Sequence, residues 1–322
     1  MKKELSYYET VKMISEIKRI FEEGLEKRLC LLKVQSPLFV KIKSGLQDDL
    51  SGVEEAVGFI KDGERYEIVH SLAKWKREAL GKYGFKDGTG ILTDMKAIRK
   101  DEIIDEIHSM YVEQWDWEKV IRREDRCIDY LKDTVSKIYK TIRQTAITMR
   151  KRYPFLEISL PKSIYFITSQ ELEDKYPDKT PKERERLICK EKLAVFIIGI
   201  GEKLKSGISH DMRSPDYDDW KLNGDMLIYD KIIAKAVEFT SMGIRVDKDS
   251  LIYQLHESGC DERIKYPYHQ KIIQEEIPFS IGGGLGISRI CMLILGKNHI
   301  AEVQASSWDD KLYHELRDYQ IL

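Results

Sequence analysis

A glycine-rich segment near the C-terminus has the clearest capacity for phosphate chemistry. Residues 279–289 read FSIGGGLGISR, so glycines lead directly into a predicted helix, Ile287–Leu295, with Arg289 in its first turn. Glycine lets the backbone approach a ligand closely, the free N–H groups at a helix start attract anions, and a guanidinium binds phosphate oxygens as a fork. The segment has no Walker lysine and no GxGxxG after a strand, so by itself it is equally compatible with a structural turn.

The segment Ile91–Arg99 predicts a strand that ends in a cation. Alternation with period 2 places Arg99 on the same face as Thr93, Met95 and Ala97. Arg99 could therefore face a site, and the alternative is a solvated arginine on the surface.

The segment Tyr111–Glu118, YVEQWDWE, predicts a strand with two different faces. Alternation puts Trp115 and Trp117 on one face, which we expect to be buried. The other face carries Gln114 and Asp116 side by side. An amide next to a carboxylate is unusual for a simple core strand, so this face is a candidate wall of a site.

Length and composition limit the class of protein that holds these groups. The chain has 322 residues, 54 Lys+Arg against 55 Asp+Glu, and 42% hydrophobic residues, which excludes a disordered chain. A net charge near zero removes any global electrostatic reason for binding nucleic acid. The longest apolar run, Leu193–Ile200, falls short of the roughly 18–20 residues that span a bilayer. MKKELSYYET lacks the core of a signal peptide, and the five cysteines include no CxxC pair, so we expect a cytoplasmic protein.

The hydrophobic pattern predicts helices and strands in irregular alternation. Helices are expected at Leu5–Lys27, Leu72–Lys82 with Ser71 as N-cap, most of Glu118–Arg152, Gln170–Lys175, Pro181–Lys192, Lys248–Glu257, Tyr268–Glu276 and Ile287–Leu295. Strands are expected at Leu31–Val40, interrupted by Pro37, and at Tyr66–Val69, Ile91–Arg99, His108–Trp117, Ser163–Ile167, Leu193–Ile200, Asp225–Tyr229 and Ala234–Ser241. Asp211–Trp220 predicts a polar loop. Because the strands come in clusters with helices inserted between them, the pattern favours an α+β fold.

In chain order, several segments resemble the motifs of class II aminoacyl-tRNA synthetases. Pro37 in LLKVQSPLF, Arg99 in MKAIRKDE and Arg289 in GGGLGISR are similar to motifs 1, 2 and 3, in particular those of aspartyl- and asparaginyl-tRNA synthetases. Over roughly residues 31–305 the chain resembles the ammonia-dependent (type A) aspartate–ammonia ligases. The similar segments are GLQDDLSG, HSLAKWKR, YVEQWDWE, DYDDW, LNGDM, SMGIRVD and IGGGLGISR. The resemblance implies a class II synthetase-like antiparallel sheet flanked by helices.

The resemblance also implies a reaction, the ATP-dependent amidation of L-aspartate with ammonia. In this family the aspartate β-carboxylate attacks the α-phosphate of ATP, which gives β-aspartyl-AMP and pyrophosphate. Ammonia then displaces AMP and L-asparagine forms. The implied partners are L-aspartate, ATP and ammonia, with Mg²⁺ as cofactor, and neither nucleic acid nor a membrane is expected to bind.

Residues 1–322 are expected to form a single catalytic domain. Only about 30 residues precede the motif-1-like strand, whereas an anticodon-reading OB domain needs roughly 100. Lys2 follows Met1, where a glutamine-hydrolysing synthetase needs a cysteine, so no glutaminase domain is expected. Since motif 1 lies at a two-fold interface in class II folds, the helix Leu5–Lys27 and the strand Leu31–Val40 suggest a homodimer.

The resemblance assigns the nucleotide-binding groups. Arg99 is expected at the α-phosphate and the attacking carboxylate, and Arg289 at the γ-phosphate end of a bent ATP. Glu238, with Asp225 in support, is expected to hold Mg²⁺, because oxygen ligands suit that ion. The alternative for Asp225 is a turn residue after Asn223-Gly224. Further residues expected in the ATP pocket are Arg213, Asp218, Ser241, Gly283 and Gly284.

The substrate end follows from the same comparison. Lys76 and Arg245 stand where aspartyl-tRNA synthetases bind the side-chain carboxylate of aspartate. Because this reaction activates that carboxylate, we expect a reversed substrate whose α-carboxylate binds Lys76 and Arg245, with Ser71 beside them. Three residues are left for catalysis at the ammonium side: Asp48, Gln114 and Asp116. Which of these orients the substrate amino group stays open.

Two other functions are weighed against this one. An enzyme of the same fold could transfer an aminoacyl group to tRNA, and a synthetase-like domain could be a catalytically inactive binding module. The cationic and acidic groups of the motifs are intact, which argues against an inactive module: Arg99, Arg289, Lys76, Glu238 and Arg245. The acidic run Asp216, Asp218 and Asp219 could be a metal cluster, but a solvated acidic loop is the preferred interpretation.

Overall fold

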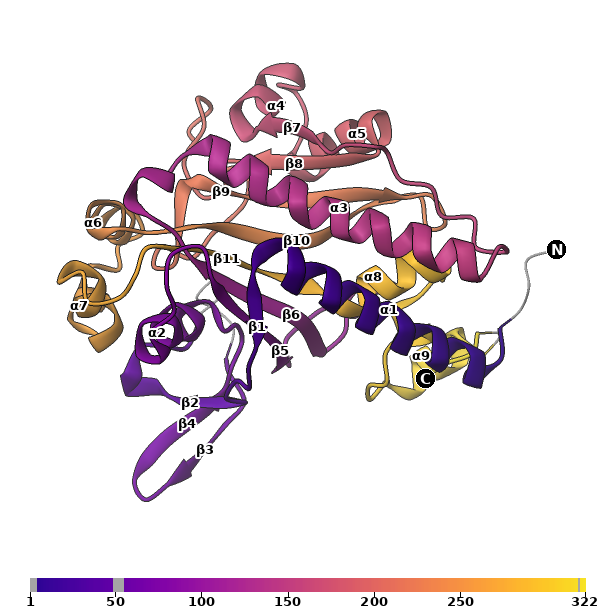
Figure 1. The fold of residues 1–322 in the computed structure, drawn as a ribbon, viewed down its shortest axis with the longest axis horizontal. Coiled ribbons are helices and arrows are strands. Elements are labelled where there is room, and N and C mark those ends of the chain that lie inside the picture. The colour runs from indigo at the N-terminus through magenta and orange to yellow at the C-terminus, as the bar shows by residue number, and fades with distance from the viewer. Residues whose placement is uncertain (1–4, 49–54, 318) are drawn as a thin grey trace.

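A mixed sheet of eight strands forms the centre of the computed structural model, which describes residues 5–48, 55–317 and 319–322 (Figure 1). Its strands, in spatial order, are β1 (Leu31–Lys33), β5 (Gly90–Ile98), β6 (Tyr111–Val120), β11 (Ser280–Gly286), β10 (Lys235–Arg245), β9 (Asp218–Asp230), β8 (Ala194–Ile198) and β7 (Tyr165–Thr168). Neighbours are antiparallel except at the two edges, where β1 pairs with β5 and β7 with β8 in parallel. The fold is therefore α+β, as the sequence predicts.

Helices cover the sheet. They are α1 (Tyr7–Leu29), α2 (Ala73–Tyr83), α3 (Ile128–Arg152), α4 (Ser169–Lys175), α5 (Pro181–Lys192), α6 (Lys248–Glu257), α7 (Pro267–Ile273), α8 (Ile287–Leu295) and α9 (Asp310–Glu315). The helices α1, α3 and α8 lie side by side on one face (Figure 1). In the described chain, no helix combines the length and the apolar character that crossing a membrane requires.

The main core lies between this helix layer and the sheet. Trp115 and Trp117 of β6 are fully buried there, and Phe21 of α1 stacks on Trp115 with ring centroids 4.4 Å apart. Burying side chains of this size is a large part of what holds a domain together. The alternation in YVEQWDWE thus fixes β6 with its aromatic face inward, and it leaves Gln114 and Asp116 on the opposite face of the sheet.

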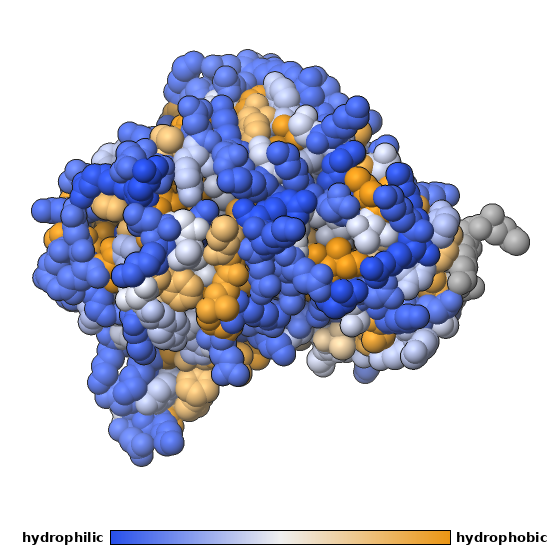
Figure 2. Space-filling model, in the orientation of Figure 1, coloured by the Kyte–Doolittle hydropathy of each residue, from blue (hydrophilic) through white to orange (hydrophobic). Residues whose placement is uncertain are grey.

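A second, three-stranded sheet projects from the body (Figure 1). It consists of β2 (Phe39–Lys41), β4 (Glu64–Ile68) and β3 (Gly58–Lys61). The turn between β3 and β4 uses Asp62 and Gly63, both at positive φ, which suits a tight hairpin. Apolar side chains gather on this projection (Figure 2), where Phe59 stacks on Tyr66 with centroids 5.3 Å apart.

The predicted strand Leu31–Val40 is wrong as one element. Its two halves, β1 and β2, belong to different sheets, because Pro37 lies between them and cannot donate to a ladder. The hairpin strand β3 has no counterpart in the prediction. The polar loop expected at Asp211–Trp220 ends earlier, because β9 already begins at Asp218.

Helix boundaries agree better. The bounds of α5, α6 and α8 are confirmed, and α5 shows why: Thr180 caps the Glu183 amide, and Pro181 follows as the first helical residue. The long predicted helix Glu118–Arg152 begins only at Ile128, since β6 continues to Val120. Two further corrections concern helix ends. Leu72 rather than Ser71 is the N-cap of α2, although the Ser71 hydroxyl accepts the Ala73 amide at 3.1 Å, and α7 ends at Ile273.

Candidate active site

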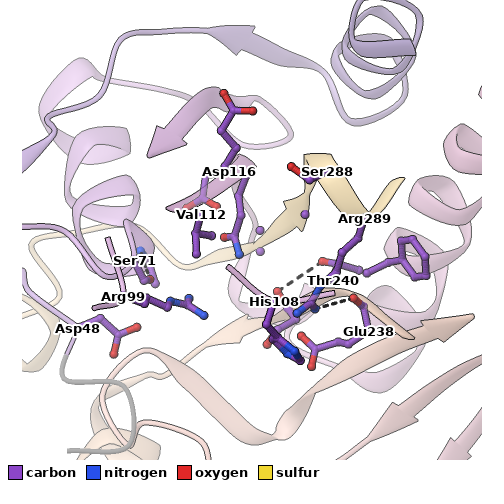
Figure 3. A pocket seen from close by; sticks show the side chains of 18 of the residues that line it. Asp48, Ser71, Arg99, His108, Val112, Asp116, Glu238, Thr240, Ser288 and Arg289 are labelled. Atoms are coloured by element: carbon purple, nitrogen blue, oxygen red, sulfur yellow. Dashed lines mark hydrogen bonds between the residues drawn. The ribbon is translucent and has the colours of Figure 1, made fainter. Parts of the chain in front are cut away.

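A cavity of about 270 Å³ opens on the sheet face opposite α1, α3 and α8 (Figure 3). Residues from both halves of the chain line it, because β5, β6, β11 and β10 are adjacent in the sheet. Among the residues that the sequence predicts for the site, all but Asp225 line this cavity. They are Asp48, Ser71, Lys76, Arg99, Gln114, Asp116, Arg213, Asp218, Glu238, Ser241, Arg245, Gly283, Gly284 and Arg289.

Glycines form the floor of the cavity as a strand, so the alternative of a structural glycine turn before α8 is wrong. β11 lies between β6 and β10, with Gly284 opposite Asp116 on one side and Ser241 on the other. A Cβ on Gly284 would lie 2.5 Å from Asp116 Oδ1 and would also collide with the Gln114 amide. The glycine is therefore needed because neighbouring polar side chains lie across the strand.

Lys76 enters the cavity from α2 and is fully buried. Its Nζ lies 2.9 Å from Asp116 Oδ2 and donates to the Gly283 carbonyl oxygen at 2.9 Å. The other carboxylate oxygen, Asp116 Oδ1, is buried and has no hydrogen-bond partner among the described residues. A buried acceptor of this kind favours a donor from a ligand.

Arg245 is also fully buried, at the end of β10. It donates to Glu118 through Nε at 2.8 Å and Nη2 at 2.6 Å, and Nη1 donates to Asp218. Ser280 Oγ donates to the same Glu118 carboxylate at 2.7 Å. Burial alone would lower the pKa of the Arg245 guanidinium, but Glu118 and Asp218 outweigh it and raise that pKa well above its usual value.

Two further cations of the cavity, Arg289 and Arg99, form no hydrogen bond with a carboxylate of the described residues. Arg289 donates from Nη1 to the Glu238 carbonyl oxygen at 2.9 Å and from Nε to the Ile107 carbonyl oxygen at 3.3 Å. Arg99 Nε is buried and has no hydrogen-bond partner in the described part of the chain. Burial lowers the pKa of Arg289, and the positive charge of Arg99 lowers it further although nearby carboxylates oppose this. Two neighbouring cations of this kind suit an anionic ligand.

Carboxylates stand beside these cations. Burial raises the pKa of Glu238 to about 6, and the charge of Asp225 contributes. Asp225 lies behind the cavity wall within β9, so a turn role for it is wrong. It accepts a bond from Arg213 Nη2 at 2.6 Å, while Arg213 Nη1 donates to Ser241 Oγ. The described residues contain no group of three or more His, Cys, Asp or Glu side chains that could hold a metal.

Comparison with known proteins identifies the family. The family model of aspartate-ammonia ligase matches residues 8–320. An aspartate–ammonia ligase of Clostridium perfringens strain SM101 is 55% identical over 320 residues, covering 98% of this chain and 95% of the relative. One of Bacillus cereus is 53% identical over 306 residues, covering 94% of each chain.

The chain belongs to the aspartate–ammonia ligase family. Solved structures of similar fold include asparaginyl- and aspartyl-tRNA synthetases. The Entamoeba histolytica enzyme in complex with asparaginyl-adenylate has a TM-score of 0.67 at 15% identity, covering 92% of this chain and 66% of that chain. The Pyrococcus horikoshii enzyme complexed with asparaginyl-adenylate has a TM-score of 0.66 at 16% identity, covering 91% and 67%. The chain spans about two thirds of the length of these synthetases, and the likeness establishes the shared catalytic-domain fold.

Several residues that line or support the cavity are missing from the sequence prediction. Glu118 continues the alternation of Gln114 and Asp116, so period 2 alone could have found it. Gln304 lines the cavity and donates from Nε2 to Ser288 Oγ and to the Tyr111 carbonyl oxygen, each at 3.0 Å. Nothing in the sequence pattern indicates that this C-terminal residue returns to the sheet.

The predicted solvated acidic loop is wrong. The carboxylates of Asp216, Asp218 and Asp219 are buried, and each has a different cationic partner. The three partners are Lys74 for Asp216 at 2.7 Å, Arg245 for Asp218, and Arg126 for Asp219 at 2.8 Å. Buried carboxylates are stable when such partners satisfy them, and no local pattern reveals partners so far away in sequence.

Proposed function

We propose that this cavity makes asparagine from aspartate, ammonia and ATP through a β-aspartyl-AMP intermediate, with release of AMP and pyrophosphate. ATP-dependent asparagine synthesis from aspartate and ammonia is the activity of an aspartate–ammonia ligase. The observation that best supports the two-step chemistry is that Arg99 and Arg289 line the same cavity as Lys76 and Arg245. A nucleotide and an amino acid can thus meet between them.

In the first step, a β-carboxylate oxygen attacks the α-phosphorus and pyrophosphate leaves. Two anions must approach each other, so positive charge is needed where they meet. We assign that role to Arg99, whose Nε has no partner within the described residues. Arg289, held by the Glu238 and Ile107 carbonyl oxygens, is assigned to the far phosphates of a bent ATP.

The Glu238 side chain is the proposed Mg²⁺ ligand, with Asp225 in support. Burial and the nearby Asp225 charge disfavour its ionised form, and a cation would relieve this. Mg²⁺ usually takes one or two carboxylates and completes its shell with phosphate oxygens and water, so a pair of acids is sufficient. Bound there, Mg²⁺ would neutralise phosphate charge. Asp225 also keeps Arg213 in place through their 2.6 Å bond.

The amino-acid end is proposed to hold aspartate by its α-carboxylate and α-amino groups. Lys76 and Arg245 are the cations for the α-carboxylate, and their partners Asp116, Glu118 and Asp218 fix where these cations lie. Asp116 Oδ1 is an acceptor for an ammonium group. In the second step ammonia attacks the activated carbonyl carbon and AMP leaves.

The proposed roles at the ammonium side belong to Asp48, Gln114 and Asp116, which all line the cavity. A carboxylate there attracts NH₄⁺ and accepts the proton that must leave before nitrogen attacks. Ser71, next to Lys76 in the cavity wall, is proposed to contact the amino acid.

We also propose that two copies associate through the edge formed by α1 and β1. β1 is the last strand of the large sheet, and the Leu32 side chain on it is 61% exposed. An open edge with apolar side chains favours a partner. Light scattering should give the mass of a dimer, and a monomer mass would contradict it. A cytoplasmic location, with residues 1–322 acting as one catalytic domain, is part of the same proposal.

The deciding experiment measures two reactions with the purified chain. Aspartate-dependent exchange of pyrophosphate into ATP should occur without ammonium, since adenylation comes first. Asparagine and AMP should then form in equal amounts when ammonium is added. Turnover that requires tRNA, or ADP in place of AMP, would overturn the proposal.

A further inference from the structure

A buried group of polar side chains lies next to the amino-acid end without lining the cavity. Its centre is Asp216, which is 0% exposed. The carboxylate accepts a bond from Lys74 Nζ at 2.7 Å and from Ser214 Oγ at 2.9 Å. Lys74 binds the Oδ2 atom of Asp216. His269 Nε2 lies 3.1 Å from this Oδ2 atom, and Arg263 Nη1 lies 3.6 Å from it.

Lys74 connects this carboxylate to the segment that carries Asp48. Its Nζ also donates to the Gln47 main-chain carbonyl oxygen at 2.9 Å. The Gln47 side chain in turn accepts the amides of Asp48 at 3.1 Å and of His70 at 3.0 Å. The Asp48 backbone is therefore held by a chain of bonds that ends at Asp216.

Asp216 also fixes the opposite wall, because Tyr217 and Asp218 follow it directly. Asp218 pairs with Arg245, and the Tyr217 ring lies 5.7 Å from the Arg245 guanidinium. Burial raises the pKa of Tyr217 well above its usual value, and the Asp48 charge adds to this. Tyr217 and Asp48 both line the cavity.

We propose that Asp216 is a positioning residue for the amino-acid end: through Lys74 and Gln47 it holds Asp48, and through the chain itself it holds Tyr217 and Asp218. The Asp48 segment and the Tyr217–Asp218 segment, which are far apart in sequence, are thus both connected to the buried carboxylate of Asp216. The inference rests on the proposed function and adds to it a residue that touches no substrate. A buried carboxylate with two or more cationic neighbours is well suited to this, since displacing any partner leaves a buried charge unpaired.

The nucleotide end depends less on Asp216. The Arg213 guanidinium donates to Asp225 of β9 and to Ser241 of β10, although its Nε also lies 3.8 Å from Asp218. Arg289 is held by main-chain carbonyl groups. Loss of the Asp216 carboxylate should therefore weaken the binding of aspartate and ammonium more than the binding of ATP.

The test compares Asp216→Asn with a matched control, Glu173→Gln. Glu173 is a buried carboxylate of α4 that pairs with Arg184 at 3.2 Å and accepts Ser206 Oγ at 2.7 Å, and it does not line the cavity. In the full chain, Asp216→Asn should raise the KM for aspartate and for ammonium at least tenfold, with the KM for ATP changed less than threefold. The control should change all three less than twofold.

A second readout needs no activity. Hydrogen exchange at the amides of Asp48 and His70 should be at least tenfold faster in Asp216→Asn than in the parent chain, and unchanged in Glu173→Gln. If Asp216→Asn does not fold, Ser214→Ala removes one bond to the same carboxylate and should shift both readouts in the same direction by about threefold.

Equal changes in all three KM values, or equal hydrogen-exchange rates in the two variants, would overturn the positioning role proposed for Asp216. A parent chain that makes no asparagine would instead refute the proposed function, and the exchange comparison would still decide whether Asp216 holds the Asp48 segment.

Discussion

The two ends of the cavity differ in how their cationic side chains are paired. At the amino-acid end, Lys76 and Arg245 are fully buried and already paired with protein carboxylates. At the nucleotide end, Arg99 and Arg289 are only partly buried and donate to main-chain carbonyl groups or have an N–H without a partner in the described chain. The two cations of the amino-acid end are therefore paired without any ligand, whereas those of the nucleotide end are available to an anionic ligand.

Solvation explains the difference. A fully buried cation needs an anion from the protein, since an unpaired charge costs several kcal/mol. ATP brings several negative charges of its own, so Arg99 and Arg289 need no carboxylate partner from the protein where ATP binds. Substitutions at the nucleotide end should thus reduce catalysis and leave stability unchanged, while those at the amino-acid end should reduce both.

The largest effect is expected for Arg99→Met. Loss of a charge-stabilising donor at the reacting phosphate should lower kcat by about 10²–10³-fold or more. The melting temperature should not fall, because no carboxylate in the described part of the chain is paired with Arg99. Steady-state kinetics and thermal melts check both parts. The control is Arg122→Met, a surface cation paired with Asp125, which should keep kcat within twofold. A fall in kcat below tenfold would contradict the assignment.

Glu118→Gln tests the paired end. It leaves Arg245 buried beside a neutral amide, so the free energy of unfolding should fall by about 3 kcal/mol, and the KM for aspartate should rise. Denaturant titration measures the loss. Glu113→Gln on the same strand is the matched control, because the Glu113 side chain is 20% exposed and pairs with Lys18 near solvent, so its loss should cost less than about 1 kcal/mol. An equal loss of unfolding free energy in the two variants would mean that the buried Glu118–Arg245 pair stabilises the protein no more than the exposed Glu113–Lys18 pair does.

Gly284→Ala tests how tightly the floor of the amino-acid end is packed. The added methyl meets the Asp116 carboxylate and the Gln114 amide, so overpacking should cost about 1–3 kcal/mol of unfolding free energy and lower kcat. In Gly286→Ala the nearest atoms would be at 3.6 Å, an ordinary contact, and stability should change by less than about 1 kcal/mol. A fully stable and active Gly284→Ala variant would show that the Asp116 and Gln114 side chains can shift to accept the added methyl group.

The smallest effect concerns acid stability. Burial opposes ionisation of Asp216, but Lys74 and His269 outweigh it, so its pKa lies below the usual 3.8. The folded state then binds the proton less well than the unfolded state, so the stabilisation is present above pH 3.8 and is lost as the pH falls below it. The gap in unfolding free energy between the parent chain and Asp216→Asn should narrow by about 1 kcal/mol per pH unit there. A gap that stays constant between pH 6 and pH 3 would contradict the paired state.

Local patterns predicted the groups that bind, but not how they are held. The period-2 alternation of YVEQWDWE placed Gln114 and Asp116 on the cavity face and the tryptophans in the core, and the structure confirms this. The same reasoning misjudged the acidic run at 216–219 as solvated. Its cationic partners lie 142 positions away for the Asp216–Lys74 pair and 27 positions away for Asp218–Arg245. Burial of a charged residue depends on such distant partners, so the spacing of residues in the sequence cannot predict that burial.

The sequence by itself determined the fold class and the helix boundaries with strong caps, because these follow from side-chain type and from periods of two or about 3.6 residues. Its resemblance to a known family added most of the predicted cavity residues. Only the tertiary structure decided that the glycines form a strand, that Glu118 pairs with Arg245 over 127 positions, and that Asp216 connects two walls of the cavity. These features depend on the order of strands in the sheet, which brings distant segments into contact, and no local period encodes that order.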